Sequence, residues 1–358
     1  MITCFTGAVL VFEEELQHAF HKERYFVKPG KGTTPIETLI ATVQQKIPGA
    51  IINGVKVFTD SSRSIEISIS SGKEGGKPLQ KKNASEKKEV NKVARTIAFI
   101  NPYSGEIIEQ YDHRKSFFFT MMSLHRWLLA GDIGKMIVGI CTLLFLIILV
   151  TGIILWWPKT NKILKQRLKV KWQGGWKRLN HDMHIVLGFY ASIFLFIFAF
   201  TGLAWSFSWF NKAIYTVTNS SMEQPKPSVI TYQPDTKTLS YDQVLQCIKN
   251  NNSRVHFYNI NAPKDSVSPY SVTVLPFSAA HESANDLYLV NRYEQRIIYS
   301  QKYSERNPGQ IIRSTFKPVH IASIWGLPSK IIGLLVCMLG VIFPATGYIM
   351  WWLRTRRK

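Results

Sequence analysis

The chain has 358 residues, is 46% hydrophobic and carries a formal net charge of +21. A soluble protein this basic would suggest nucleic-acid binding, but here the cations gather beside apolar runs. Eight Lys or Arg and no acid lie in 159–178, and four more cations end the chain. Such clusters are typical of the cytoplasmic segments of membrane proteins. We therefore exclude nucleic acid as a partner and expect the lipid bilayer instead.

The N-terminal segment, residues 1–17, is first apolar and then acidic. Its apolar part, Met1–Phe12, is too short to cross a bilayer and lacks the basic start and cleavage site of a signal peptide. It contains Thr6-Gly7, which lies 195 residues before Thr201-Gly202. We therefore interpret residues 1–17 as the second half of a first transmembrane helix that starts upstream of Met1.

Residues 18–115 are polar and mixed in charge, which predicts a soluble α+β domain. The apolar spacing in Pro35–Ile47 predicts an amphipathic helix. A segment from Lys73 to Lys92 is rich in Lys, Gly and Glu and predicts a loose loop. Runs of β-forming residues predict strands at 50–58, 64–70, 93–100 and 106–111, the last two joined by a hairpin.

The stretch 116–158 predicts two helices separated by a bend. Ile137–Trp157 contains 21 residues without a charge. At about 1.5 Å per residue, this run spans the ~30 Å hydrocarbon core of a bilayer. One straight helix from His125 to Trp157 would be about 48 Å long, which exceeds that thickness. We therefore expect an interfacial helix at 116–131, a bend at Gly131-Asp132 and a transmembrane helix at 132–158.

The rest of the chain repeats this plan. We expect a cytoplasmic basic loop at 159–180, a transmembrane helix at 181–210 and a second α+β domain at 211–313. An interfacial helix is expected at 314–328, with a break at Leu327-Pro328. A transmembrane helix at 329–353 and a tail at 354–358 complete the chain. In the second domain, a helix is expected at 240–250 and strands at 255–260, 270–275, 287–290 and 296–299.

The two halves share residues at a constant spacing. His125, Thr151-Gly152 and Trp156-Trp157 recur 195 residues later as His320, Thr346-Gly347 and Trp351-Trp352. The fold class is therefore a membrane α-helical bundle of four transmembrane helices, the first one truncated. It carries two duplicated α+β domains on the side of the membrane opposite the basic clusters.

Two histidines at equivalent positions, His125 and His320, support the first functional hypothesis. Both are expected at the outer membrane face, because the basic clusters mark the inner one. In a pseudo-twofold assembly, equivalent imidazoles can face each other and bind a six-coordinate haem iron from both sides. Alternatively, each is an interfacial residue hydrogen-bonded to lipid headgroups or backbone. The residues alone leave both interpretations open.

His184 is a third candidate, at the inner face, seventeen residues before Thr201-Gly202. Its symmetric partner would lie upstream of Met1, so an inner haem site would be incomplete in this chain. His181 lies on the same helix face but is a weaker candidate, because two His alone seldom make a metal site. Asp182 could instead orient a His ligand through its second ring nitrogen.

The Thr-Gly pairs recur in all four apolar segments and have two explanations. Small residues let helices pack closely, which is the interpretation we favour, or they leave room for a flat macrocycle. The sequence contains no GxGxxG, P-loop, GxSxG, HExxH or CxxC motif. Electrons for a redox role would therefore come from a quinol or from a separate cytoplasmic flavoprotein.

Four segments together resemble the PepSY-associated transmembrane helix family. They are LHRWLLAGDIGKMIVGI…LVTGIILWWPK, LNHDMHIVLGFYASIFLFIFAFTGLAW, PVHIASIWGLPSKIIGLL…ATGYIMWWLR and FTGAVLVFEEEL. The resemblance implies a multi-pass protein of a bacterial inner membrane, with periplasmic PepSY-like domains and an iron-regulated role linked to siderophore uptake. Some members resemble di-haem ferric-siderophore reductases. On that pattern His125, His320 and His184 are candidate axial ligands of one or two haem b groups, although the family's usual basic stretch and His at the start of the first helix are missing here.

Two functions follow as hypotheses. The first is a haem-containing reductase that passes electrons across the membrane to a periplasmic ferric siderophore or another iron chelate. The second is a non-enzymatic membrane protein whose PepSY-like domains bind a periplasmic partner, such as a protease, a peptide or a transporter component. The first hypothesis requires bound haem, whereas the second predicts that His125 is dispensable.

Overall fold

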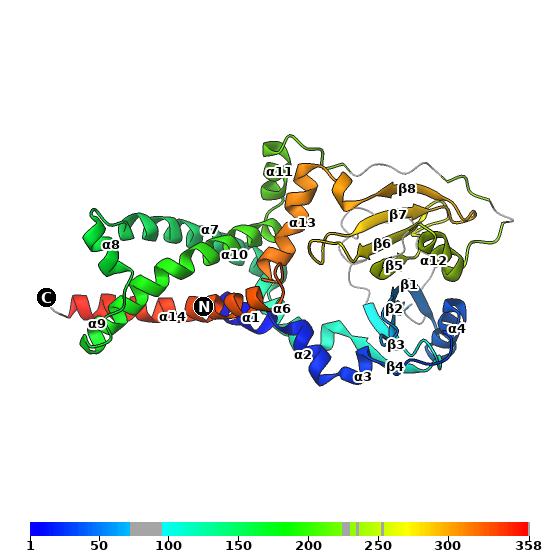
Figure 1. Cartoon of the computed structure of the whole chain (residues 1–358), viewed down its shortest axis with the longest axis horizontal. Helices are drawn as coiled ribbons and strands as arrows, with labels where there is room; N and C mark the ends of the chain where they lie inside the picture. Colours follow the sequence, from blue (N-terminus) through cyan, green and yellow to red (C-terminus); the bar gives the residue numbers. More distant parts are fainter. Residues whose placement is uncertain (72–94, 224–229, 234–235, 252–253, 357–358) are drawn as a thin grey trace. The chain divides into compact units, whose positions relative to one another are not determined.

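The computed structural model describes residues 1–71, 95–223, 230–233, 236–251 and 254–356 (Figure 1). The predicted loose loop at 73–92 lies outside these residues. The chain divides into two compact units. The helical unit comprises Met1–Glu13, Phe117–Met222 and Asn307–Lys358, and the sheet unit comprises Glu14–Ser116 and Glu223–Arg306.

The sheet unit contains an antiparallel sheet of eight strands in the order β4-β3-β2-β1-β5-β6-β7-β8. The strands are β1 (Ala50–Phe58), β2 (Ile65–Ser71), β3 (Arg95–Ile100), β4 (Ile107–Asp112), β5 (Val255–Asn261), β6 (Tyr270–Pro276), β7 (Asp286–Val290) and β8 (Ile297–Gln301). Every strand predicted from the sequence is present. The predicted hairpin between β3 and β4 is also confirmed, with a hydrogen bond from the backbone N–H of Asn101 to the carbonyl of Glu106 at 2.9 Å.

Strands β1 and β5 join the two halves of the sheet. They pair antiparallel from Gly54 opposite Asn261 to Phe58 opposite Phe257. A Cβ atom on Gly54 would lie 2.8 Å from the carbonyl oxygen of Ile260, so the absence of a side chain permits this approach. The two soluble segments, which the sequence analysis treats as separate domains, therefore share one sheet. In each half the first strand would otherwise leave an open edge, and the pairing of β1 with β5 covers both edges.

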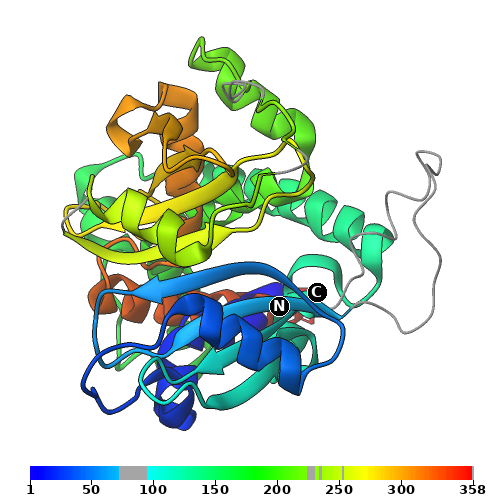
Figure 2. The ribbon, with the colours of Figure 1, turned by 90° about the vertical axis from the view of Figure 1, so that its right-hand side faces the viewer.

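Helices α4 (Ile36–Lys46) and α12 (Tyr241–Lys249) pack on the hydrophobic core of this sheet, on one face (Figure 2). Their N-termini also bind each other. The Asp242 carboxylate accepts hydrogen bonds from the backbone N–H groups of Ile36 at 3.0 Å and Glu37 at 3.2 Å, and Glu37 Oε1 accepts one from the N–H of Tyr241 at 2.5 Å. Each helix thus supplies a carboxylate to the positive end of the other helix dipole.

We expect Asp242→Ala to destabilise the sheet unit by about 1–2 kcal/mol, because it leaves two backbone donors of α4 without their acceptor. The free energy of unfolding, followed by far-UV circular dichroism in denaturant, measures this change. Gln246→Ala, on the exposed side of the same helix, is the matched control. Equal losses of stability in the two variants would contradict this account.

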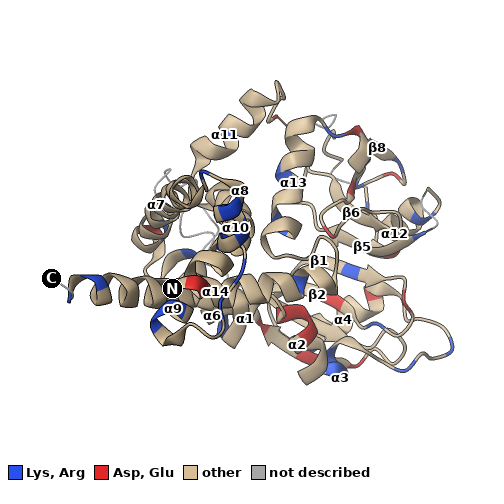
Figure 3. Cartoon of the chain, turned by 60° about the vertical axis from the view of Figure 1, so that its left-hand side comes forward, with Lys and Arg blue, Asp and Glu red and all other residues tan. Residues whose placement is uncertain are grey.

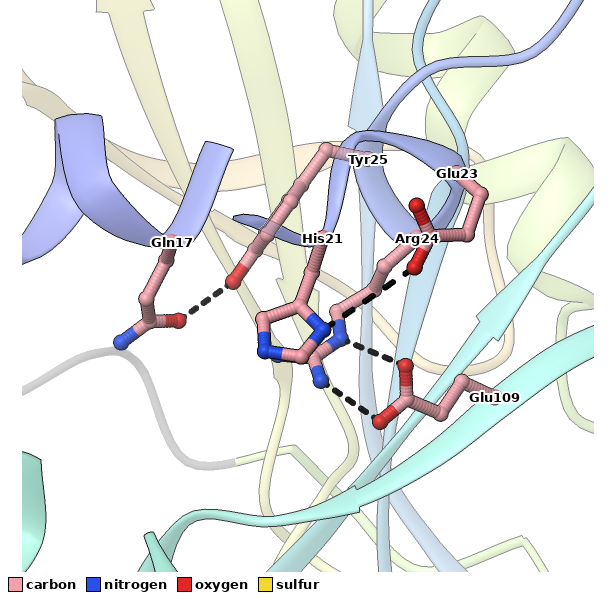
Figure 4. Close-up of polar contacts among 6 residues, drawn as sticks. All are labelled: Gln17, His21, Glu23, Arg24, Tyr25 and Glu109. Carbon is pink, nitrogen blue, oxygen red and sulfur yellow. Dashed lines mark hydrogen bonds and ion pairs between the residues drawn. The ribbon is translucent and has the colours of Figure 1, made fainter. Parts of the chain in front are cut away.

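An ion pair with a buried arginine attaches the N-terminal part of the sheet unit, α2 (Glu13–Phe20) and α3 (Lys22–Tyr25), to the sheet. The Arg24 side chain is 3% exposed, and its Nε and Nη2 donate to the two carboxylate oxygens of Glu109 at 2.8 and 2.6 Å (Figure 4). Its guanidinium also lies 4.2 Å from the ring centre of Tyr111. The Tyr25 hydroxyl donates to Gln17 at 2.5 Å. These contacts fix the position of two short helices and suggest a structural role.

In the helical unit, three helices among the described residues are long and apolar enough to cross a membrane. They are α7 (Gly131–Trp156), the continuous α9–η2–α10 (Gly175–Asp182, Met183–Leu187 and Gly188–Ser206) and α14 (Leu327–Thr355). The shorter helices are α1 (Ile2–Leu10), α6 (Phe117–Trp127), α8 (Asn161–Arg167), α11 (Ser208–Val217) and α13 (Pro308–His320). The N-terminal segment 1–17, predicted as part of a first span, contains the nine-residue helix α1 and the start of α2.

The predicted basic loop at 159–180 contains α8 and the start of α9, so it is partly helical. Lys and Arg lie along both helices and near the end of α14 (Figure 3). The third long helix consequently begins at Gly175, before the predicted boundary at 181, and ends at Ser206. Helix α11 follows within the helical unit, so the second soluble segment begins later than the predicted residue 211.

Residues with positive φ lie at the junction of α6 with α7 and at the junction of α13 with α14. Leu128, Leu129 and Gly131 have φ of 50, 57 and 56° between α6 and α7, which confirms the bend predicted at Gly131. Ala322 and Gly326 have φ of 55 and 67° between α13 and α14. The second break therefore precedes the predicted Leu327-Pro328, because Pro fits well in the first turn of a helix.

Candidate functional site

Helices α6 and α13 bring His125 and His320 together. The ring centres are 6.0 Å apart and the ring planes make an angle of 72°. Each residue keeps some exposed surface, but burial of the imidazoles lowers the pKa of both to about 4, and each lies close enough to Arg126 for its charge to add to the effect. Both imidazoles are therefore neutral near pH 7, which is the form that binds a metal.

The Nδ1 atom of each ring faces helix backbone. For His125, Nδ1 lies 3.0 Å from the carbonyl oxygen of Thr3 and 3.1 Å from the Thr6 hydroxyl. For His320, it lies 2.9 Å from the carbonyl oxygen of Phe198 and 3.1 Å from the Thr201 hydroxyl. A carbonyl oxygen only accepts hydrogen bonds, so the single proton of each neutral ring lies on Nδ1. The lone pair is then on Nε2.

This pair suits a metal that brings its other ligands with it. Two imidazoles that bind one metal from opposite sides, each through a nitrogen about 2 Å away, place their ring centres roughly 6 Å apart. No group of three or more His, Cys, Asp or Glu suited to a bare metal ion occurs in the part of the chain that the structure describes. A pair of imidazoles is one of the ligand sets that proteins supply to a haem iron, whose other four positions the macrocycle fills.

Aromatic and cationic side chains surround the His pair. The Trp205 ring centre lies 5.1 Å from that of His320. The Arg313 guanidinium lies 5.2 Å from the same Trp205 ring, and Arg313 Nε donates to Asn211 Oδ1 at 2.6 Å. An aromatic ring thus lies beside His320, with a cation packed against that ring.

The third predicted ligand, His184, lies apart from this pair. Along α9–η2–α10 it is seventeen residues from Thr201, which is about 25 Å at the helical rise. Its Nδ1 is 2.8 Å from the Thr346 hydroxyl of α14, and its ring centre is 5.6 Å from that of Phe343. It borders a cavity of about 320 Å³ with a mainly apolar lining that includes Trp176, Leu187 and Leu339.

His181, the weaker candidate, does not share the position of His184. Its Nδ1 is 3.2 Å from the Asp182 carboxylate, which also forms an ion pair with Arg178 at 2.8 Å. Asp182 therefore contacts His181, and Thr346 takes the orienting role at His184 that the sequence analysis suggested for Asp182. His184 itself lies in the π-helical turn Met183–Leu187.

The structure adds three residues that the sequence analysis did not connect with the histidines: Thr6, Thr201 and Thr346. Thr6 and His125 are separated by 119 residues, and so are Thr201 and His320. This equal spacing was visible in the sequence. An equal spacing between Thr and His does not by itself indicate contact. It does so only when it is known which helices pack together, and the sequence does not show this.

Comparison with known proteins gives one result for the whole chain. The model of the family described as the PepSY-associated TM region matches residues 1–354, and so includes the helices and the strands alike. No individual curated protein matches the chain.

Proposed function

This chain belongs to the family of the PepSY-associated TM region, and on that premise we propose that it is a haem-containing reductase of a bacterial inner membrane. It passes single electrons from the cytoplasmic side to a ferric siderophore or another ferric chelate on the periplasmic side. Fe(II) binds hard oxygen ligands more weakly than Fe(III), so the reduction releases iron for uptake. The electron donor is a quinol or a cytoplasmic flavoprotein.

The observation that supports this proposal is the pair of neutral imidazoles of His125 and His320, whose ring centres lie 6.0 Å apart. On each ring, Nδ1 is hydrogen-bonded to a backbone carbonyl oxygen. These residues would hold haem b through Nε2. When bound, haem b supplies a one-electron iron couple. If both imidazoles held the haem, His125 and His320 would fix its position and would leave no open coordination site for water.

The arrangement in the membrane follows from charge and repetition. We place the basic α8, α9 and the end of α14 in the cytoplasm, and the sheet unit in the periplasm. The contact of His125 with Thr6 and that of His320 with Thr201 support a duplicated unit of four spans, with α1 as part of the first. His184, near the inner face, is the candidate ligand of a second haem.

Electron delivery is tested with the full-length protein, purified in detergent and reduced anaerobically with a stoichiometric amount of dithionite. Ferric citrate is then added, and both the α band and the Fe(II) formed are followed. We expect the haem to be reoxidised with one Fe(II) released per electron. A haem-containing protein that stays reduced beside ferric citrate would contradict the reductase. A haem-free protein with an unaltered fold would favour the binding of a periplasmic partner.

A further inference from the structure

Three Thr-Gly pairs of the helical unit are each in contact with a histidine ring. His125 lies on Thr6-Gly7, His320 on Thr201-Gly202 and His184 on Thr346-Gly347. In every case Nδ1 lies 2.8–3.1 Å from the Thr hydroxyl. In every case, too, a Cβ atom on the Gly would lie 3.2–3.3 Å from Cε1 of that His. The same contact thus occurs three times, on three different helices.

The chemistry of the pair explains the contact. The Thr6 hydroxyl donates to the carbonyl of Ile2 at 2.8 Å, and the Thr201 hydroxyl donates to that of Ile197 at 2.7 Å. Since the hydroxyl proton is used within the helix, the oxygen can only accept from Nδ1–H. The Gly that follows lets the ring approach the helix. A Cβ atom at this Gly would lie closer to the ring than in an ordinary van der Waals contact and would push the ring away from the helix.

We propose that the Thr-Gly pair is a seat for a metal-binding imidazole, in which Thr and Gly are positioning residues. Thr fixes the proton on Nδ1, and Gly sets the distance of the ring from the helix, so that Nε2 is presented in one direction. This proposal rests on the proposed function for the identity of the iron that Nε2 binds. At Gly7 helix packing contributes as well, since a Cβ atom there would lie 3.5 Å from Sγ of Cys337 on α14.

The fourth pair, Thr151-Gly152 on α7, provides a matched control. Its hydroxyl donates to the carbonyls of Ile147 at 2.8 Å and Ile148 at 3.1 Å, as in the other pairs. No atom lies within 4 Å of a Cβ on Gly152, counting all described residues. The same two residues on the same type of helix therefore occur here without an imidazole.

The three seats differ in a way that ranks the expected effects. His125 and His320 each have a backbone carbonyl within 3.0 Å of Nδ1 as well as the Thr hydroxyl. For His184, the Thr346 hydroxyl is the Nδ1 partner found among the described residues. Removal of the hydroxyl should therefore weaken the outer pair less than it weakens His184.

The first test measures haem content and midpoint potential in the purified full-length protein. Thr201→Val and Gly202→Ala should each weaken haem binding by about tenfold, within the 10–100-fold range of residues that orient metal ligands. Thr6→Val and Gly7→Ala should do the same. Both substitutions should also raise the midpoint potential, because a less basic imidazole stabilises Fe(III) less. Thr151→Val and Gly152→Ala should match the wild type. Equal results at 151–152 and 201–202 would overturn the proposal.

A second measurement separates this proposal from the proposed function. The nitrogen-15 NMR shifts of histidine-labelled full-length protein report which ring nitrogen carries the proton, with or without haem. We expect His125, His320 and His184 to be protonated on Nδ1, and Thr346→Val to change the signal of His184 most. Protonation on Nε2 in all three would overturn the seat even if haem is present. If the protein contains no haem but Nδ1 is protonated, the proposed role of the Thr-Gly pairs is supported and the proposed reductase is contradicted.

Discussion

Replacement of His125 or His320 by Ala is expected to weaken haem binding at this pair by more than about 100-fold, beyond the 10–100-fold effect of residues that only orient a ligand. Each variant removes one of the two imidazoles whose ring centres lie 6.0 Å apart, and no side chain capable of replacing a nitrogen ligand is created. The loss is measured as the ratio of Soret to protein absorbance after reduction.

The control for these variants is His181→Ala, because the His181 side chain is 54% exposed and contacts Asp182 rather than the His pair. It should retain the haem absorbance of the wild type. Far-UV circular dichroism and size-exclusion profiles must be unchanged in all three variants. An unchanged Soret band in both His125→Ala and His320→Ala would show that the haem, if present, is held elsewhere.

Gly134→Ala is expected to destabilise the junction of α6 with α7 by about 1–3 kcal/mol and to lower the haem content with it. A Cβ atom on Gly134 would collide with the backbone carbonyl oxygen of Trp127, two residues after His125. A backbone atom cannot rotate away as a side chain does, so the end of α6 must move. That movement changes the position of the His125 imidazole.

The matched control is Gly152→Ala on the same helix, where the new methyl group meets no atom within 4 Å among the described residues. In a helix Ala is favoured over Gly by about 1 kcal/mol, so this variant should be neutral or stabilising. Thermal unfolding and haem content, measured on both variants side by side, give the comparison. If Gly134→Ala behaves like Gly152→Ala, the junction does not position His125.

Much of the fold could be predicted from the sequence because its signals are local. The charge-free run at 137–157, compared with the thickness of a bilayer, gave the bend at Gly131, which the positive φ angles confirm. Alternating residues and turn signals gave the strands. The spacing of 195 residues marked His125 and His320 as equivalent positions that can face each other, and the structure places their ring centres 6.0 Å apart.

The remaining features depend on which segments pair, and local patterns do not encode this. The single sheet depends on the pairing of β1 with β5 at their edges. In the sequence, this pairing is reflected in a glycine within the strand, Gly54, which permits the close approach. The Thr-His contacts depend on the packing of α1 against α6 and of α10 against α13. The partner of the His184 ring is Thr346, which lies on another helix and 162 residues further along the chain.

The most direct test of the account is the spectrum of the wild-type protein, purified from a haem-replete host. We predict a Soret band and a sharp α band after dithionite reduction. In the oxidised protein we predict a strongly anisotropic low-spin EPR signal, as expected for axial imidazoles whose planes are close to perpendicular, since those of His125 and His320 make an angle of 72°. A folded full-length protein with neither absorbance band would contradict the claim that these histidines bind haem.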